Sequence, residues 1–192
     1  MTSNTNEVAM NQPVTVNGVD VSQVTDLVDS FQDDKASAEM QFRLKNRWID
    51  GGLNRSHIKG FYAGCQEDDT RTETFTYDAD EPAIMAGGDT APNPVEYILH
   101  ALAGCLTTTM VYHAAVRGIE IEAIESELEG DLDARGLFGL SDKVRKGYHD
   151  VRVKMRVKSE ANAEELKELA MYSPVFDIVS NSLPVDLVVE KF

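Results

Sequence analysis

The segment Asn93-Pro94-Val95-Glu96-Tyr97-Ile98-Leu99-His100-Ala101-Leu102-Ala103-Gly104-Cys105 carries the strongest structural signal in the chain. Asparagine is a favoured helix N-cap, proline fits the first helical position, and a glutamate three residues after the cap completes a capping box. The apolar run continues to about Arg117, and Gly118 is typical of the position that follows a helix. We therefore expect one long helix over residues 94–117.

The cysteine of this segment shares one stripe of the expected helix with mostly apolar residues. At about 100° per residue, the following positions lie within about 60° of one line: Ile98, Ala101, Leu102, Cys105, Thr108, Thr109 and Tyr112. Two interpretations of the thiol stay open. Cysteine fills core space as a small apolar residue, and it is a nucleophile when it is ionised.

Residues 1–38 are expected to form an N-terminal tail followed by a short amphipathic helix. Residues 1 to about 18 are polar and have no consistent period, which is typical of a poorly ordered tail. Apolar residues then recur at helical spacing from Val21 to Phe31. Packing against the rest of the chain is the simplest role for that helix.

Three β-prone runs precede the loop that leads into the long helix. Residues 40–48 alternate apolar with polar side chains, which predicts a strand with one buried face. Residues 56–62 and 72–77 are two further strand candidates, and a polar connection, 63–69, separates them. These runs predict a small antiparallel meander.

The two β-prone runs after the long helix carry opposite charges. Residues 124–134 alternate apolar side chains with Asp and Glu, whereas residues 151–158 alternate them with Arg and Lys. Antiparallel pairing gives acidic side chains basic neighbours, at about 0.2–1 kcal/mol for each pair, so we expect these strands to pair. The connection between them, 135–148, is long and partly apolar, which predicts that it covers an opening or contacts another subunit.

A second helix is expected to begin after Asn162 and to break at Pro174. Asn162 and Glu165 repeat the capping-box pattern, and proline disfavours helical geometry at the residue before it. Residues 175–179 should restart the helix at an angle, and residues 185–189 should close the chain as a strand. The order β-β-β-α-β-β-α-α-β, with antiparallel strand groups, predicts an α+β fold.

Charge and composition restrict the classes of partner. Lys and Arg number 18 against 33 Asp and Glu, so the formal charge is −15 and neither nucleic acid nor a membrane surface is an expected partner. No apolar run approaches the length of about 18 residues that spans a membrane, and a secretory signal is absent, which predicts a cytoplasmic location. The acidic bias also fits adaptation to a salty cytoplasm. The two cysteines, Cys65 and Cys105, give no metal-ligand spacing, so no metal or cofactor is expected.

Four short motifs resemble the OsmC/Ohr family of osmotically inducible and organic hydroperoxide resistance proteins. They are Pro92-Asn93-Pro94-Val95-Glu96-Tyr97, Ala101-Leu102-Ala103-Gly104 leading to Cys105, Arg117-Gly118-Ile119 and Ser173-Pro174-Val175. The resemblance covers about residues 39–192 and implies an OsmC-like domain there, with antiparallel sheets wrapped around two central helices in an intertwined homodimer. It also implies a peroxide-reducing thiol at Cys105 that faces the dimer interface.

Two positions depart from the pattern of the peroxidases in that family. Those enzymes carry a second cysteine immediately before the Pro-Val of the broken helix, where this chain has Ser173. They also place a glutamate directly after the helix-opening proline, where this chain has Val95, with Glu96 one position later. The resemblance therefore implies a single reactive cysteine that an external thiol reduces. Cys65 is either a substitute resolving thiol or a free surface cysteine.

A thiolate rather than a thiol attacks peroxides, so Cys105 needs a cationic neighbour. The family supplies an arginine from its N-terminal sheet region, and Arg71 is favoured over Arg55 and Arg47 because it closes the loop before the third strand. An ordinary surface role is the alternative for all three. Glu96 lies about 180° around the helix from Cys105 and about 13 Å along it. It therefore acts either from a partner subunit, by orienting an arginine, or only as a helix cap.

The expected function is that of a thiol-dependent hydroperoxide reductase in oxidative-stress defence. Its expected partners are a second copy of the chain, a small-molecule hydroperoxide and an external thiol reductant. The apolar stripe beside Cys105 favours an organic hydroperoxide over hydrogen peroxide. The alternative is a catalytically degenerate dimer that binds a small apolar ligand in the same pocket, because Val95 replaces the family's acid and the second sulfur is missing.

Overall fold

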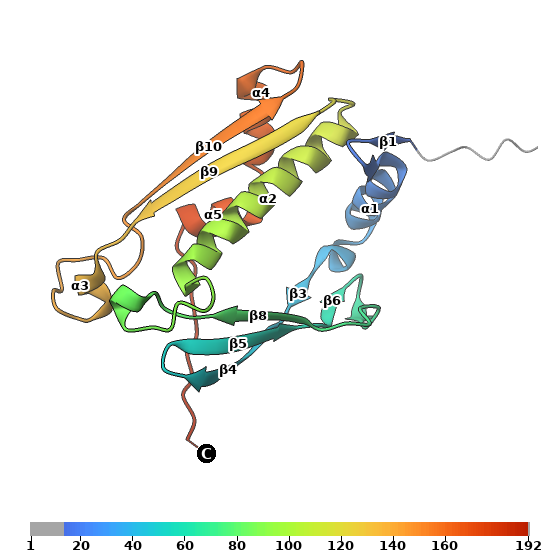
Figure 1. Cartoon of the computed structure of the whole chain (residues 1–192). Helices are drawn as coiled ribbons and strands as arrows, with labels where there is room; N and C mark the ends of the chain where they lie inside the picture. Colours follow the sequence, from blue (N-terminus) through green and yellow to red (C-terminus); the bar gives the residue numbers. More distant parts are fainter. Residues whose placement is uncertain (1–13, 192) are drawn as a thin grey trace, which may run out of the picture.

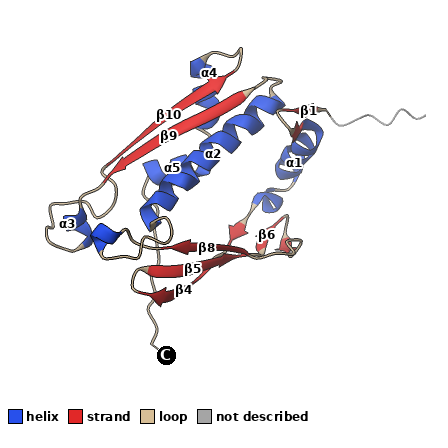
Figure 2. Cartoon of the chain, in the orientation of Figure 1, coloured by secondary structure: helices blue, strands red, loops and turns tan. Residues whose placement is uncertain are grey.

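The long helix α2 (Pro94–Val116) runs through the middle of the structure, with the strand pair β9 (Ala123–Asp131) and β10 (Asp150–Lys158) along one side (Figure 1). The computed structural model describes residues 14–191. Helices and strands alternate along the chain, and every strand pair in this range is antiparallel (Figure 2). The predicted α+β class is confirmed.

The start and the end of α2 follow from local capping. The Asn93 side chain accepts a hydrogen bond from the Glu96 amide (2.9 Å), and the Glu96 carboxylate accepts one from the Asn93 amide (2.8 Å). Pro94 occupies the first helical position, and Gly118 has a φ of +69° just beyond the last turn. Both ends of the predicted helix are therefore confirmed within one residue.

The loop before α2 is organised by the buried carboxylate of Asp80. That carboxylate accepts hydrogen bonds from the Thr90 hydroxyl (2.8 Å), the Thr90 amide (3.1 Å) and the Glu81 amide (2.8 Å). A Cβ on Gly87 would lie 1.8 Å from the Glu81 carbonyl oxygen, so only glycine fits at that position. Asp80 thereby fixes the direction in which the chain enters the helix.

The charged strands pair as their sequences predict. In the ladder, Glu129 lies opposite Arg152, and Glu125 lies opposite Arg156. Ion pairs join Arg156 to Glu125 (2.6 Å) and Arg152 to Asp131 (2.6 Å). These side chains are exposed, so each pair adds little stability, but together they specify the register.

The core lies between α2 and the broken second helix, which consists of α4 (Ala163–Ala170) and α5 (Pro174–Ser180). Its fully packed members are Leu102, Leu106, Met110, Ala114, Leu166, Leu169 and Ala170. The α2 members recur every four residues, which places them on one face of that helix. The apolar sides of β9 and β10 pack against this cluster. The predicted break at Pro174 is confirmed.

The N-terminal segment is more ordered than its composition predicts. Residues 1–13 of the expected tail lie outside the described residues, but β1 (Thr15–Val16) and β2 (Val19–Asp20) form a hairpin before helix α1 (Val21–Asp33) and a 3-10 turn, η1 (Lys35–Ala38). The turn residue Asn17 donates a hydrogen bond to the Ile119 carbonyl (2.9 Å) and accepts one from the Ile121 amide (2.8 Å). The expectation of a tail as far as residue 18 is wrong because this turn is anchored beyond the end of α2.

The predicted meander is present but contains more strands than expected. The short strands β3 (Gln41–Phe42), β6 (Phe61–Ala63) and β7 (Gln66–Asp68) form one sheet. The longer strands β4 (Lys45–Asp50), β5 (Leu53–Ile58) and β8 (Phe75–Ala79) form the other. The polar connection 63–69 is not a simple loop, because Gly64 and Cys65 make a tight turn with positive φ that leads into β7.

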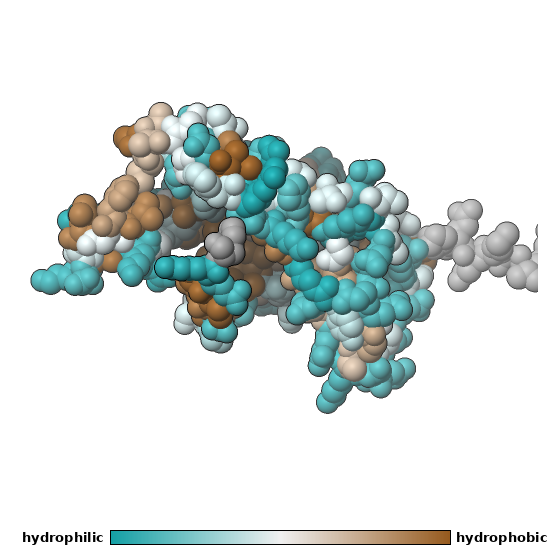
Figure 3. All heavy atoms as spheres, turned by 90° about the horizontal axis from the view of Figure 1, so that it is seen from below, coloured by the Kyte–Doolittle hydropathy of each residue, from teal (hydrophilic) through white to brown (hydrophobic). Residues whose placement is uncertain are grey.

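Two expectations about buried strands are wrong within one chain. The apolar residues of the run 40–48 are exposed, with Phe42 at 67% and Trp48 at 70%. Residues 181–191 belong to no helix or strand, and Val185 and Val189 are more than four-fifths exposed. Seen from below, hydrophobic patches lie among hydrophilic side chains on the surface (Figure 3). Neither segment is covered by the described part of its own chain.

Candidate functional site

Cys105 lies at the border of the buried face of α2, about 60° around the helix from Leu102 of the core and about 100° from Leu106. Its side chain is partly exposed and does not belong to the packed cluster. Two neighbours on the same stripe are also open, since Ile98 is 46% exposed and Tyr112 is 50% exposed, whereas Leu102 is buried in the core. Cys105 therefore does not belong to the packed core cluster of the described chain. The thiol borders an apolar helix face that the described chain leaves open.

Arg71 is held on the meander without an ion-pair partner among the described residues, although its charge, after the hydrogen bonds from Thr70, contributes to lowering the pKa of Asp68. Its guanidinium donates a hydrogen bond to the Lys59 carbonyl (2.9 Å) and lies 4.6 Å above the centre of the Phe61 ring and 5.4 Å from that of Phe75. Across residues 14–191, no ion pair is formed by Arg71, and no hydrogen bond joins it to Cys105. One chain therefore positions this arginine on an aromatic platform but does not bring it to the thiol.

The two other candidate arginines differ in their availability. Arg55 makes a bidentate pair with Asp78 (2.6 and 2.7 Å), and this hydrogen bonding holds the pKa of Asp78 below its ordinary value. The Tyr97 hydroxyl donates to the Asp78 carbonyl (2.6 Å), which ties the first turns of α2 to β8. Arg47 lies opposite Arg55 on the exposed strand β4. Arg55 is thus already used in a structural ion pair, which weakens its candidacy.

Glu96 completes the capping box described above, so its carboxylate has a structural role at the start of α2. Close to it, the Tyr148 hydroxyl donates a hydrogen bond to the Val95 carbonyl (2.9 Å). Burial, and secondarily the charge of Glu96, raises the pKa of Tyr148. Tyr148 therefore anchors the long 135–148 connection to the helix start. Sequence reasoning missed this contact, because a lone tyrosine in a loop gives no signal of its partner.

Ser173 occupies the position of the family's second cysteine and is 1% exposed. Its hydroxyl accepts a hydrogen bond from the Phe176 amide (3.1 Å), which caps α5. Next to it, the Tyr172 ring stacks on His113 of α2, with ring centres 4.5 Å apart. Burial, followed by the charge of Arg117, lowers the pKa of His113. The junction between α4 and α5 is thereby fixed against α2.

Cys65, the possible substitute thiol, lies exposed at the tip of the β6–β7 turn with a φ of +63°. Both cysteines are free thiols. Between residues 14 and 191, no group of three or more His, Cys, Asp or Glu side chains gathers closely enough to hold a metal ion. In the same range, no helix has the length and apolar character required to cross a membrane.

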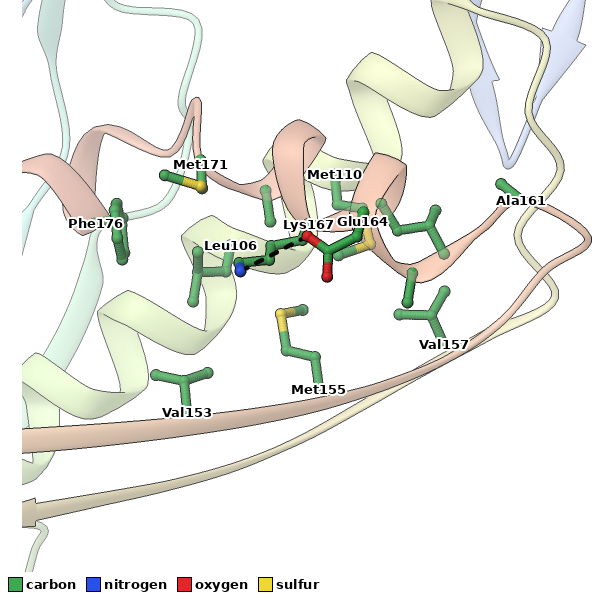
Figure 4. Close-up of a pocket in the computed structure, with 13 residues that line it drawn as sticks. Leu106, Met110, Val153, Met155, Val157, Ala161, Glu164, Lys167, Met171 and Phe176 are labelled. Carbon is green, nitrogen blue, oxygen red and sulfur yellow. Dashed lines mark ion pairs between the residues drawn. The ribbon is translucent and has the colours of Figure 1, made fainter.

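Sequence reasoning also missed a cavity that does not include Cys105. It has a volume of about 520 Å³ and lies between α2, β10 and the helix pair α4–α5 (Figure 4). Three methionines, Met110, Met155 and Met171, contribute to its walls. Met110 lies on α2, Met155 on β10 and Met171 directly after α4, so no local pattern in the sequence brings them together.

Comparisons with known proteins agree on one family. The sequence profile described as OsmC-like protein matches residues 87–188, which is more than half of the 192-residue chain. No curated protein sequence matches the chain.

Solved structures share the fold at low sequence identity. An OsmC-like protein from Mycoplasma pneumoniae is 14% identical with a TM-score of 0.55, and the match covers 74% of this chain and 89% of that chain. A Vibrio cholerae OsmC-like protein of unknown function is 13% identical with a TM-score of 0.51, covering 78% and 97%. A Psychrobacter arcticus 273-4 protein, named for an osmotic stress induced and detoxification response, is 16% identical with a TM-score of 0.52, covering 69% and 83%. With the profile match and the shared architecture together, the chain belongs to the OsmC-like protein family.

Proposed function

We propose that this protein is a thiol-dependent hydroperoxide reductase of oxidative-stress defence, with Cys105 as its single peroxidatic cysteine. The observation that carries the proposal is the position of Cys105, partly exposed on an open apolar face of the central helix. Membership of the OsmC-like family and the detoxification name of the Psychrobacter arcticus relative support it. Ser173, as a buried helix cap, leaves no second sulfur at the family's resolving position.

The reaction consists of one oxidation and one reduction of the same sulfur. The Cys105 thiolate attacks the terminal oxygen of an organic hydroperoxide, the O–O bond breaks, and the alkoxide leaves as an alcohol after taking a proton. The alkoxide takes this proton from solvent, so the oxidised cysteine is a sulfenic acid, which condenses with an external thiol to form a mixed disulfide and water. A second external thiol then displaces the Cys105 thiolate and leaves as a disulfide. Two free cysteines fit the reducing cytoplasm as the location.

The active form is a homodimer in which each protomer completes the site of the other. Three apolar surfaces of one chain are exposed: the Cys105 face of α2, the meander and the C-terminal segment 181–191. Exposed apolar areas of this kind are typical of subunit interfaces. Arg71 of one protomer lies against Cys105 of the other and stabilises its thiolate, with Glu96 orienting the guanidinium.

The direct test is peroxide consumption by the full-length protein with cumene hydroperoxide and a dithiol reductant. Wild type and Cys65→Ser should consume peroxide at similar rates, whereas Cys105→Ser should not. Equal consumption by Cys105→Ser would refute the proposal. Slow turnover by all three proteins, with a Cys105 pKa above about 8, would favour the degenerate ligand-binding dimer.

A further inference from the structure

The cavity between α2, β10 and α4–α5 has the size and lining of a small-molecule site. Its volume of about 520 Å³ lies within the range of about 300–1,000 Å³ found for ligand pockets. The helix α2 contributes Leu106 and Met110, β10 contributes Val153 and Met155, and α5 contributes Phe176. The walls are therefore aliphatic and aromatic. They come from helices and a strand whose other apolar side chains form the core.

This cavity is separate from the proposed peroxidatic site. Around the axis of α2, Leu106 points about 100° and Met110 about 140° away from Cys105. Cys105 does not line the cavity. A ligand bound there would contact a different side of the helix from the thiol.

The lining favours a flexible ligand over a rigid one. Figure 4 shows Met155, Met110 and Met171 on three sides of the cavity. Methionine side chains are unbranched and polarisable, and they adapt to irregular or changing apolar shapes. An alkyl chain, which takes many conformations, fits such walls better than a planar ring system does.

Only two lining residues carry a formal charge, Lys167 and Glu164 of α4. Their ion pair spans 3.9 Å, and their side chains are 68% and 84% exposed. Exposed ion pairs of this kind contribute little to stability, so Lys167 can exchange Glu164 for another carboxylate with little loss of free energy. In Figure 4 the Lys167 side chain extends over the cavity toward Leu106.

We propose that this cavity binds an aliphatic carboxylic acid, with the alkyl chain between α2 and β10 and the carboxylate paired with Lys167. Glu164, the more exposed member of the pair, stays hydrated when the ligand carboxylate replaces it. The proposal does not depend on peroxide reduction at Cys105.

The first test is calorimetric titration of the full-length protein with saturated acids of increasing chain length, from octanoate to palmitate. Each additional buried methylene should lower Kd about fourfold until the cavity is full, after which Kd should level off. Absence of binding at every length would overturn the proposal, including the case in which a second copy of the chain covers the cavity. Binding without dependence on chain length would also overturn it.

The second test separates the carboxylate contact from the apolar one. Lys167→Met should weaken dodecanoate binding about threefold to tenfold and leave dodecanol binding unchanged. Lys154→Met is the matched control, because it removes the same charge from the outer face of β10, on the strand that carries Val153 and Met155. Equal effects of the two variants on dodecanoate would refute the role of Lys167.

A third variant tests the location of the alkyl chain. Val153 lines the cavity at a partly exposed strand position, and tryptophan is tolerated in β-strands, so Val153→Trp should narrow the cavity and weaken binding of both ligands. Cys105→Ser should bind dodecanoate like the wild type. Unchanged binding by a folded Val153→Trp would overturn the proposed site. If Cys105→Ser loses peroxide consumption but still binds dodecanoate, the two sites are separate.

Discussion

The Ser173 hydroxyl accepts a hydrogen bond from the Phe176 amide, at the position where peroxidases of the family carry their second cysteine. Under the proposed reductase function, the thiol that would resolve an oxidised Cys105 is thus replaced by a helix cap. The same serine is almost fully buried, so it is a structural residue of the α4–α5 junction.

Replacement of Ser173 should separate its structural role from the lost redox role. Ser173→Ala removes the cap and should lower the free energy of unfolding by about 0.5–2 kcal/mol, as measured by urea denaturation. Ser173→Cys restores a thiol at the family's resolving position. After treatment with cumene hydroperoxide, mass spectrometry under non-reducing conditions should find a disulfide between the new thiol and Cys105. A lasting sulfenate in this variant would show that the two positions do not meet.

Removal of the Arg71 guanidinium should weaken the nucleophile. A cation within about 4–6 Å lowers a thiol pKa, so Arg71→Ala should raise the midpoint of the pH profile of Cys105 alkylation by about 1 unit or more. Peroxide consumption at neutral pH should fall about tenfold as the thiolate fraction falls. Arg71→Lys should recover only part of the rate, because lysine lacks the planar group that stacks on Phe61 and Phe75.

Arg47→Ala is the control for that experiment, since Arg47 is an exposed arginine of the same meander. It should leave the alkylation profile unchanged. If Arg47→Ala shifts the profile and Arg71→Ala does not, the assignment of the activating arginine is wrong, although the reductase proposal itself survives.

Asp80 should stabilise the fold only when it is ionised. Hydrogen bonds from Thr90, first from its hydroxyl and then from its amide, lower the pKa of Asp80 below its ordinary value of 3.8. The stabilisation is therefore present above pH 3.8 and is lost as the pH falls through the folded-state pKa. At neutral pH, Asp80→Asn should lower the Tm by several degrees, and the difference from wild type should shrink in acid. Asp89→Asn, an exposed change in the same loop, should leave the Tm unaltered.

His113 should make the protein less stable in mild acid. Burial lowers the pKa of His113 below its ordinary value of 6.5, so the unfolded chain binds a proton more readily than the folded one. The contribution of neutral His113 to stability should be fully present above pH 6.5 and should decrease as the pH falls below that value. His113→Phe keeps a ring against Tyr172 and should reduce the difference in Tm between pH 5 and pH 8. An unchanged difference would assign the acid sensitivity to other groups.

Local signals in the sequence were sufficient for α1, α2, α4, α5 and one strand pair, but not for the short helix α3 (Ala134–Leu137) in the connection after β9. The capping box at Asn93 and Glu96, the break at Pro174 and the opposite charges of β9 and β10 act over short range or between complementary faces. Cys105 was singled out as a candidate because it lies in a well-defined helix. The surroundings of Cys105 could not be predicted from the sequence, because they depend on which surfaces of the chain stay uncovered.

Predictions that required a distant partner were less successful. The segment 185–189 has a strand-like sequence, but a strand exists only where a neighbouring edge accepts its hydrogen bonds, and none of the described residues supplies one. The apolar residues of 40–48 are exposed rather than buried, because no described element covers that face of the strand. The cavity near Met155 arises where α2, β10 and the α4–α5 pair pack together, and the periodicity of a single element does not predict such a cavity.

The anchor at Asn17 has a consequence for the connectivity of the chain. Its side chain holds the segment just after α2, while Tyr97 holds Asp78 near the first turn of the same helix. The segment from Asn17 to Asp78 is thus hydrogen-bonded at its first residue to the chain after α2 and at its last residue to the start of α2, a helix about 34 Å long. A protease that nicks α1 would open this ring at one point, and the two fragments would remain joined without a covalent bond.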